Sequence, residues 1–479
     1  MTRTSSLTLP SITLDRETNI PIYLQLYRRF RDAIVSGSLR PGDRIASVRS
    51  LASELHLARG TVEMAYQMLT SEGYFLARGP AGTFVSHQLN GLSQSTSSTP
   101  VSNARQSHPS PLTAQGILPF QTGIPALDAF PRKTWSRLMG RRMRSLDTAA
   151  LHYPEPEGYG PLRQTVAAYL GISRGIACSY EQVFITAGYH GTLALICQAL
   201  FQNGDTGWYE DPGYPLARDF LQRAGMQLIP VPVDDNGLNV SHGKQLAPQA
   251  RFALVTPTHQ FPLGVALSLA RRLELLAWAN QQQSWIIEDD YDSEFRYRGH
   301  PLPALKSLDQ RGRVLYCGTF SKVLFPGLRL GYLVVPPKYI RRFADVAKTL
   351  PGPGFILPQA TVADFMEQGH FTRHLRKMRL LYATRRGYLV DALGQTFGNR
   401  FTLPSLAGGT HLLALPHEAR TDRALAEAAQ SQGLAIKAIS RWCIQEAKQN
   451  GLLLGFTNIN GPENALMLTQ QLQRALDME

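Results

Sequence analysis

Hydrophobic residues follow two different periods along this chain. Up to residue 69 they recur every three or four positions, within 22–34, 48–55 and 62–69, which is the spacing of one helix face. The segments YFLAR and TFVS then flank a glycine-rich turn at 79–82, as the two strands of a hairpin do. The pattern therefore predicts three short helices followed by a hairpin.

Further along the chain, apolar residues come in short continuous runs. These runs are VFITAG, FALVTP, WIIEDD, VLYCGTF and GYLVVP, and longer helical stretches separate them. Continuous apolar strands are typical of a mostly parallel sheet that is covered on both faces. The sequence thus predicts an α/β fold, and ligand sites in such sheets lie at the carboxyl ends of the strands.

A third kind of sequence separates these two parts. It reads QLNGLSQSTSSTPVSNARQSHPSPLTAQG and contains almost no large apolar residues, so it cannot bury a core. We therefore expect a small domain at 1–87, a flexible linker at 88–116 and a large domain at 117–479.

Composition adds only weak constraints. The net charge of the 479 residues is +13, which favours polyanionic partners such as nucleic acid. Residues 1–87 hold ten arginines against seven acidic residues, so most of the excess charge lies elsewhere.

Features that the sequence lacks disfavour a membrane protein, a disulfide-rich protein and a metalloprotein. It has no run of about 18 apolar residues, so we expect no membrane span. Its four cysteines are widely spaced, so we expect no disulfide framework and no metal site, and a location in the reducing cytoplasm.

The most specific chemistry lies in the motif GTFSKVLFPGLRLG at 318–331. The amine of Lys322 is suited to form a Schiff base with the aldehyde of pyridoxal 5'-phosphate (PLP). The hydroxyls of Thr319 and Ser321 and the guanidinium of Arg329 are suited to bind its phosphate. This spacing matches fold-type I aminotransferases, and it predicts Lys322 as the reactive lysine of a PLP site.

A second motif, IIEDDY at 286–291, ends an apolar run with three carboxylates. A carboxylate that faces the pyridine nitrogen of PLP keeps that nitrogen protonated. The residues alone leave open whether Glu288, Asp289 or Asp290 has this position. The resemblance to aminotransferases implies Asp289, with Tyr291 near the phenolic oxygen of the cofactor.

The same resemblance implies roles for four further residues. Tyr189 and His190 begin a helix after a strand, where backbone N–H groups can bind phosphate. Tyr214, in the DPGYP segment, corresponds to the ring that stacks on the pyridine. Tyr153 is similar to a tyrosine that reaches the phosphate of the partner subunit, which implies a homodimer.

Two departures from the aminotransferase pattern affect substrate binding. The usual Asn-Pro-x-Gly reads FPLG at 261–264, so His259 or Gln260 would have to replace the asparagine. The usual Arg-x-x-Phe, whose arginine binds the substrate carboxylate, reads LLGF at 453–456. Arg441 is the nearest candidate to bind an effector carboxylate.

The N-terminal segment resembles the GntR-type winged helix-turn-helix over nearly its full length. Arginine side chains and helix N-termini are common contacts to bases and phosphates. The start of the third helix reads ARGT at 58–61, where Ser-Arg-Asn-Thr is usual, and this change should weaken that helix start by about 1 kcal/mol. The resemblance implies these DNA contacts: Ser47, Arg49, Arg59, Thr61, Arg78 and Gly82.

Taken together, both parts resemble the MocR family, in which a GntR-type domain precedes a fold-type I domain with a large α/β part and a smaller C-terminal α+β part. The resemblance implies a homodimeric regulator that binds double-stranded DNA and senses an amino compound, or PLP itself, through Lys322. Two alternatives remain. One is an aminotransferase with real turnover that also binds DNA, and the other is a DNA-binding protein whose large domain is only a dimerisation scaffold.

Overall fold

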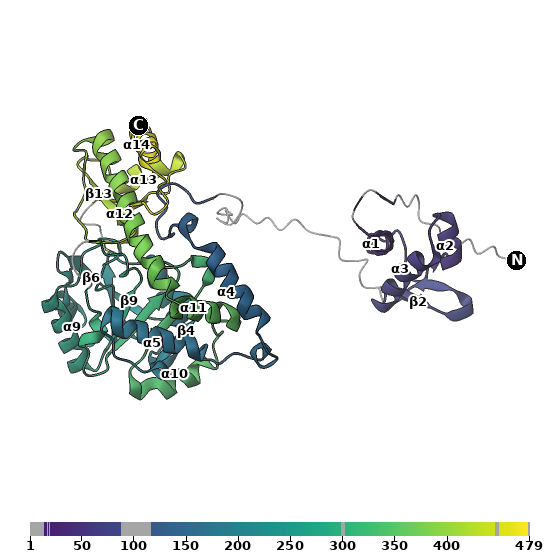
Figure 1. Ribbon diagram of the computed structural model, residues 1–479, viewed down its shortest axis with the longest axis horizontal. Helices are drawn as coiled ribbons and strands as arrows, with labels where there is room; N and C mark the ends of the chain where they lie inside the picture. The colour runs from purple at the N-terminus through teal and green to yellow at the C-terminus, as the bar shows by residue number, and fades with distance from the viewer. Residues whose placement is uncertain are drawn as a thin grey trace. The chain divides into compact units, whose positions relative to one another are not determined.

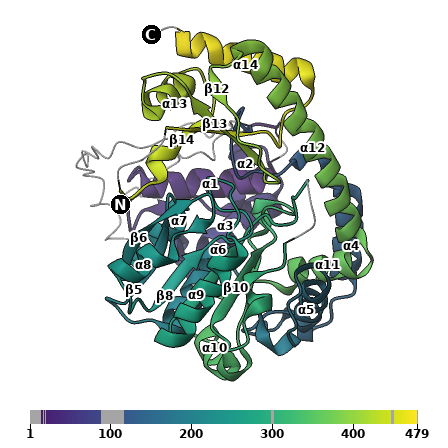
Figure 2. The ribbon, with the colours of Figure 1, turned by 90° about the vertical axis from the view of Figure 1, so that its left-hand side faces the viewer.

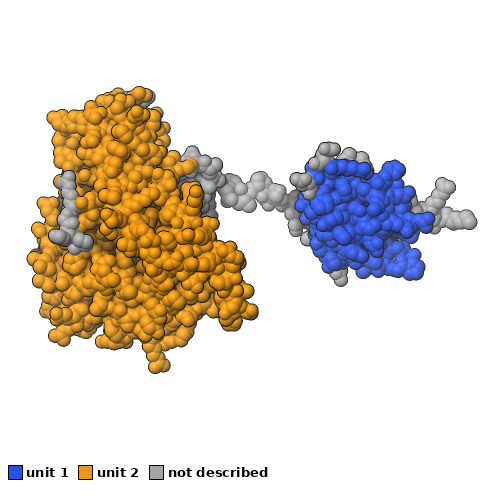
Figure 3. Space-filling view, in the orientation of Figure 1, with its two compact units in different colours: residues 1–113 blue, residues 114–479 orange. Residues whose placement is uncertain are grey.

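The computed structural model divides the chain into two compact units, Met1–Thr113 and Ala114–Glu479 (Figure 3). Of the expected linker, only Gly116 lies within the described part of the chain. The structure describes residues 14–16, 18, 20–87, 116–297, 302–445 and 450–477.

The N-terminal unit confirms the three helices and the hairpin, and a short extra strand, β1, extends the hairpin into a sheet of order β1-β3-β2. Four-residue spacing in α1 buries Leu26, Phe30 and Ile34 on one face. The rings of Phe30, Tyr66 and Phe75 pack edge to face, with centroids 5.2–5.6 Å apart. The elements are α1 (Ile22–Val35), β1 (Arg44–Ile45), α2 (Val48–Glu54), α3 (Arg59–Ser71), β2 (Phe75–Ala77) and β3 (Thr83–Val85).

The larger unit is organised around an eight-stranded sheet of order β4-β11-β10-β9-β8-β5-β6-β7 (Figure 1). The strands β10, β9, β8, β5 and β6 are mutually parallel, whereas β11 runs antiparallel to both of its neighbours and β7 antiparallel to β6. The strands are β4 (Val183–Thr186), β5 (Thr206–Asp211), β6 (Gln227–Asp234), β7 (Gly237–Leu238), β8 (Phe252–Val255), β9 (Trp285–Asp290), β10 (Val314–Thr319) and β11 (Gly331–Val334).

Helices cover both faces of this sheet, which explains its continuous apolar strands. Along β10, Leu315 and Cys317 pack in one cluster with α6, α7 and α10, while Val314 and Tyr316 pack in clusters that contain α9 and α5. The helices are α4 (Arg132–Arg144), α5 (Gly160–Arg174), α6 (Gly188–Leu200), α7 (Pro215–Arg223), α8 (Val240–Leu246), α9 (Leu269–Gln282), α10 (Ile340–Ala347) and α11 (Ile356–Glu367).

A smaller C-terminal layer completes this unit. The long helix α12 (His370–Phe397) extends from the large sheet region to this layer, where it packs on α14 (Figure 2). An antiparallel sheet of order β12-β13-β15-β14 lies there. Its remaining elements are β12 (Phe401–Thr402), β13 (His411–Pro416), α13 (Asp422–Ser431), β14 (Lys437–Ala438), β15 (Leu452–Gly455) and α14 (Pro462–Asp477).

Candidate cofactor cavity and DNA-binding surface

A cavity of about 320 Å³ lies at the carboxyl ends of β9 and β10, where the parallel-sheet pattern predicts a ligand site. Most of the residues expected at a cofactor site meet there, although they come from five separate stretches of the chain. They are Tyr189, His190, Tyr214, Asp289, Tyr291, Thr319, Ser321, Lys322 and Arg329.

Lys322 follows the end of β10, and its side chain enters this cavity. Its Nζ donates a hydrogen bond to the carbonyl of Gly123, 2.7 Å away. Burial lowers the pKa of Lys322, although Asp292 and Asp289 act in the opposite direction. A lowered pKa favours the neutral amine, which is the nucleophilic form of lysine.

The three carboxylates of β9 have different surroundings, because successive side chains of a strand point to opposite faces. Asp289 alone of the three lines the cavity. Glu288 points away and accepts hydrogen bonds from the backbone N–H groups of Leu305 and Lys306, at 2.7 and 2.8 Å. Asp290 is ion-paired with Arg174. The geometry therefore favours Asp289 among the alternatives that the sequence leaves open.

Burial raises the pKa of Asp289 to about 7, and the nearby carboxylates of Asp290 and Glu210 act in the same direction. The hydroxyl of Tyr189 lies close enough to lower this pKa, but the geometry is not that of a hydrogen bond. Within the part of the chain that the structure describes, Asp289 forms no ion pair, whereas Asp290 is paired with Arg174. A protonated ring nitrogen at this position would supply a cationic partner.

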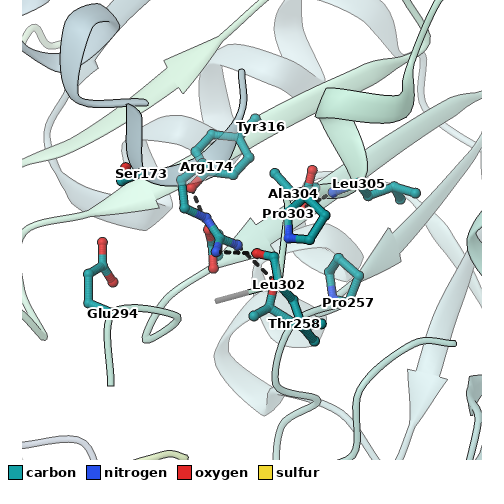
Figure 4. A network of polar contacts seen from close by, with 12 residues as sticks. Ser173, Arg174, Pro257, Thr258, Glu294, Leu302, Pro303, Ala304, Leu305 and Tyr316 are labelled. Atoms are coloured by element: carbon teal, nitrogen blue, oxygen red, sulfur yellow. Dashed lines mark hydrogen bonds and ion pairs between the residues drawn. The ribbon is translucent and has the colours of Figure 1, made fainter. Parts of the chain in front are cut away.

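A buried polar network centred on Arg174 holds Asp290, the neighbour of Asp289 at the end of β9 (Figure 4). Its guanidinium contacts Asp290 at 2.8 Å, the hydroxyl of Thr258 at 2.9 Å and the carbonyl of Leu302 at 2.8 Å. Tyr316 donates a hydrogen bond to the same Asp290 carboxylate. These contacts fix the end of β9, and with it the direction of Asp289.

Tyr291 lines the cavity and is hydrogen-bonded to His259, one of the two residues considered as a replacement for the missing asparagine. Its hydroxyl lies 2.9 Å from Nδ1 of His259, which also contacts Asp292 at 3.1 Å. Gln260, the other candidate, turns away and donates to Glu210 and to the carbonyl of Pro212. Neither candidate lines the cavity itself, but His259 contacts two residues that do: Tyr291 and, with ring centroids 6.0 Å apart, His411.

The far end of the cavity is suited to an anion. Tyr189 and His190 lie in the first turn of α6, which starts at Gly188 with a φ of +73°. Arg329 has a left-handed backbone conformation, with a φ of 52°, and its guanidinium has no acidic partner among the described residues. Thr319 and Ser321 add two hydroxyls. This end fits the phosphate of PLP, and the cavity as a whole fits the cofactor.

Two predicted residues lie outside this cavity. Tyr153 is 91 % exposed, so within one chain it contacts no cofactor site. Arg441 follows β14 and forms an exposed ion pair with Glu427, 2.7 Å away, although its neighbour Trp442 does line the cavity. The structure therefore does not bring Arg441 to a position where it could bind an effector carboxylate.

Sequence reasoning missed several residues that the structure brings to the site. Gly123 has a φ of +81°, and a Cβ there would lie 2.9 Å from Nζ of Lys322. Phe261, His411 and Trp442 line the cavity beside Tyr214. Phe261 stands at the position of the usual asparagine, so its place in the motif is the one feature of the sequence that could have identified it as a site residue.

In the N-terminal unit, the predicted DNA contacts cluster at two helix starts and the hairpin turn. Ser47 caps α2 by accepting a hydrogen bond from the N–H of Ser50, at 3.1 Å. Ala58 precedes α3 without any side-chain cap, as its residue type predicts. The predicted residues Arg49, Arg59 and Arg78 are exposed, Thr61 and Gly82 are half-buried, and Gly82 has a φ of +106°.

Two broader properties concern the described part of the chain. No helix within it combines the length and the apolar character that crossing a membrane requires. It also contains no group of three or more His, Cys, Asp or Glu side chains that could hold a metal ion.

Comparison with known proteins covers both units. Residues 22–85 match the model of bacterial regulatory proteins of the gntR family, and residues 117–446 match that of aminotransferase class I and II. The chain is 35 % identical to "Probable rhizopine catabolism regulatory protein MocR" of Rhizobium meliloti, covering 94 % of this chain and 92 % of that protein. It is 33 % identical to the "HTH-type pyridoxine biosynthesis transcriptional regulator PdxR" of Corynebacterium glutamicum, covering 92 % of both chains.

Solved structures resemble the larger unit. The kynurenine aminotransferase of Pyrococcus horikoshii is 26 % identical, with a TM-score of 0.68 over 76 % of this chain and 92 % of that one. The α-aminoadipate aminotransferase LysN of Thermus thermophilus is 25 % identical, with a TM-score of 0.68 over 76 % and 93 %. With a GntR-type winged helix ahead of a class I and II aminotransferase domain, and whole-length relatives of the same design, this chain belongs to the MocR family of transcriptional regulators.

Proposed function

We propose that this protein regulates transcription by binding DNA through its N-terminal unit and sensing an amino compound, or PLP itself, through a PLP site at Lys322. One observation carries the proposal: the amine of Lys322 and the carboxylate of Asp289 line one cavity, in a chain whose other unit is a GntR-type winged helix. The corresponding domain bounds are 1–87 for the DNA-binding domain, 88–116 for the linker and 117–479 for the effector domain.

The residues of the cavity divide by the part of PLP that they would hold. Arg329, Thr319 and Ser321, with the first turn of α6, would bind the phosphate dianion. Tyr214 offers a ring face for stacking. When bound, PLP supplies an aldehyde that reacts with amines and a ring that withdraws electrons.

Three side chains would control protons at this site. Lys322 would attach the cofactor through Nζ, and burial favours the neutral amine that this requires. Asp289 would hold the proton of the ring nitrogen between its carboxylate and the ring. Tyr291 would keep its proton, because burial raises its pKa, and its contact with His259 would orient the hydroxyl.

Regulation requires that the ligand states of the cavity differ in free energy between protein conformations. An amine that frees Lys322 would remove one covalent contact and leave an additional amine in the cavity. The exposed Tyr153 is available to complete the site of a second subunit, so we infer a homodimer as the working form. A dimer presents two winged helices, which suits a DNA target with two half-sites.

Absorbance of the purified protein tests the cofactor claim directly. Wild type should retain a coloured cofactor through desalting, and Lys322→Ala should lose it. Lys348→Ala is the matched control, because Lys348 is 60 % exposed in a surface ion pair with Asp345. If wild type and Lys322→Ala have the same spectrum, the proposal fails.

Aminotransferase turnover is the second candidate, because Lys322 and Asp289 give the cavity the amine and the carboxylate that are expected at an aminotransferase site. The position of Arg441 outside the cavity argues against efficient use of amino acids. Steady-state assays over a panel of amino and keto acids decide between the two. Turnover of about 1 s⁻¹ or faster would be ordinary for an enzyme and would favour catalysis.

A further inference from the structure

The part of the cavity that remains after the proposed cofactor contacts is lined by uncharged groups. Its most prominent members are Phe261, His411 and Trp442, which we call the aromatic wall. Burial lowers the pKa of His411 to about 4, so this imidazole is neutral near pH 7. Its Nε2 lies 3.1 Å from the carbonyl of Pro262, which identifies that nitrogen as the protonated one.

Phe261 is the centre of the aromatic wall. Its ring centroid lies 4.6 Å from that of Trp442 and 5.3 Å from that of His411. It also meets the rings of Tyr214 and Tyr291 nearly edge-on, each at 5.7 Å. The wall is therefore continuous with the two rings proposed to contact the cofactor, and a ligand held there would adjoin the reactive end of the site.

Trp442 is fixed over the cavity by a specific set of contacts. Its carbonyl accepts a hydrogen bond from the N–H of Gly213, next to Tyr214. The carboxylate of Asp211 accepts two more, from the N–H groups of Ile444 at 2.7 Å and Gln445 at 3.0 Å. These contacts join the segment after β14 to the loop after β5, so the position of Trp442 is part of the built site.

Among the described residues, the cationic side chains that line the cavity are Lys322 and Arg329, and both are assigned to the cofactor. Arg441, beside Trp442, points outward to Glu427. Arg329 belongs to the end of the cavity suited to phosphate, and the position of the usual carboxylate-binding arginine is Leu453, which is fully buried in β15. A carboxylate brought against the aromatic wall would lose its hydration and face rings and a neutral imidazole, which is unfavourable. A cationic or apolar group would instead gain contacts with ring faces.

We propose that the effector is a primary amine with an aromatic or branched apolar body and no carboxylate next to the amine, and that this body packs on Phe261, His411 and Trp442. This inference rests on the proposed function, because the amine must reach the cofactor held by Lys322. It narrows the amino compounds of that proposal to one chemical class.

Matched pairs that differ only by a carboxylate test the proposal on the cofactor-loaded full-length protein. The probes are 2-phenylethylamine against L-phenylalanine, tyramine against L-tyrosine, and 3-methylbutylamine against L-leucine. Binding is followed by calorimetry and by the absorbance of the bound cofactor. Each amine should bind at least about tenfold more tightly than its amino acid, a difference of about 1.4 kcal/mol.

Three variants identify the surface responsible. Trp442→Ala should weaken amine binding about tenfold or more while cofactor absorbance is retained. Tyr180→Ala, which removes an exposed ring outside the cavity, should not. Trp442→Arg should shift the preference toward the amino acids, because it adds a cation to the wall.

Several outcomes would overturn the proposal. Equal or tighter binding of the amino acids would do so, as would amino-acid binding that is lost in Arg441→Ala, or no binding of any of the three amines at millimolar concentration. Each of these results leaves the cofactor spectrum intact, so it differs from failure of the proposed function, in which the wild-type protein would carry no cofactor.

Discussion

Arg174 and Asp290 form an ion pair 2.8 Å long whose two side chains are only 4 % and 2 % exposed. Arg174 ends α5 and Asp290 ends β9, so the pair joins the helix layer to the strand that carries Asp289. Asp290 also accepts a hydrogen bond from Tyr316. A buried pair of this kind tolerates poorly the loss of one partner, because the other charge is then left uncompensated.

We expect Arg174→Met to lower the free energy of unfolding of the larger unit by roughly 3–5 kcal/mol. The substitution keeps much of the side-chain volume but leaves the Asp290 carboxylate without its cation. Urea unfolding, followed by the fluorescence of the tryptophans, measures the change. Lys348→Met is the control, because both side chains of its ion pair with Asp345 are about 60 % exposed, so solvent screens the pair and its loss should change stability little.

The raised pKa of Asp289 predicts a pH dependence of stability in the protein freed of cofactor. A folded-state pKa of about 7, against an ordinary value of 3.8, means that the folded protein binds this proton more tightly than the unfolded chain does. The resulting stabilisation is complete below about pH 4 and is lost as the pH rises through 7. In Asp289→Asn, the free energy of unfolding should therefore decrease less between these pH values than in wild type, by at most about 4 kcal/mol.

Unfolding of wild type and Asp289→Asn at a series of pH values checks this expectation. Glu288 and Glu294 also have pKa values raised to about 7, so both proteins should still lose stability across this range. Parallel curves for the two proteins would show that Asp289 does not titrate there. Reloading with the cofactor should stabilise wild type more than the variant.

For the DNA-binding surface, we expect Arg59→Ala to reduce affinity for a specific operator by roughly 1–3 kcal/mol, if Arg59 contacts a base. Arg59 is exposed at the start of α3, where recognition helices meet base edges. Binding curves on operator DNA and on unrelated DNA distinguish a base contact, whose loss weakens only operator binding, from a phosphate contact, whose loss weakens binding to both. Arg31→Ala is the control, because this exposed arginine of the same unit is paired with Asp32.

The uncapped start of α3 can be repaired. Ala58→Ser should add the hydrogen bond that Ser47 makes at α2, and stabilise the helix by about 0.5–2 kcal/mol. Amide hydrogen exchange in α3 of the full-length protein reports the gain as slower exchange. Ser47→Ala should produce the reverse change in α2, and unchanged exchange in both variants would contradict the capping argument.

The elements near the cavity could be predicted because their signals are local. Apolar runs identify β9 and β10, and the motif around Lys322 identifies its own chemistry. Strand alternation even contains the reason why Asp289, and neither of its two neighbours, faces the cavity. To apply this alternation, one must know which face of the sheet carries the site, and the sequence does not contain this information.

Contacts between distant segments could not be predicted in the same way. Arg174 meets Asp290 and Thr258 across more than 80 residues of sequence, and no motif marks it. Closeness in sequence to the position of the missing arginine favours Arg441, yet its neighbour Trp442 lines the cavity while Arg441 pairs with Glu427. Arg441 and Trp442 lie in a 3-10 helix of four residues, Ile439–Trp442, and the direction of their side chains depends on the tertiary contacts of this segment, here those of Asp211.

The hydrogen bond from Lys322 to the carbonyl of Gly123 has a consequence for the chain that precedes it. Gly123 lies seven residues after Gly116, where the tether from the DNA-binding unit is expected to end. The stretch between them is pinned to the C-terminal layer by the N–H of Gly455, which donates to the carbonyl of Phe120. Residues 122–124, which follow the expected linker, therefore also line the cavity, and we expect a ligand that displaces Lys322 to break its contact with this stretch directly.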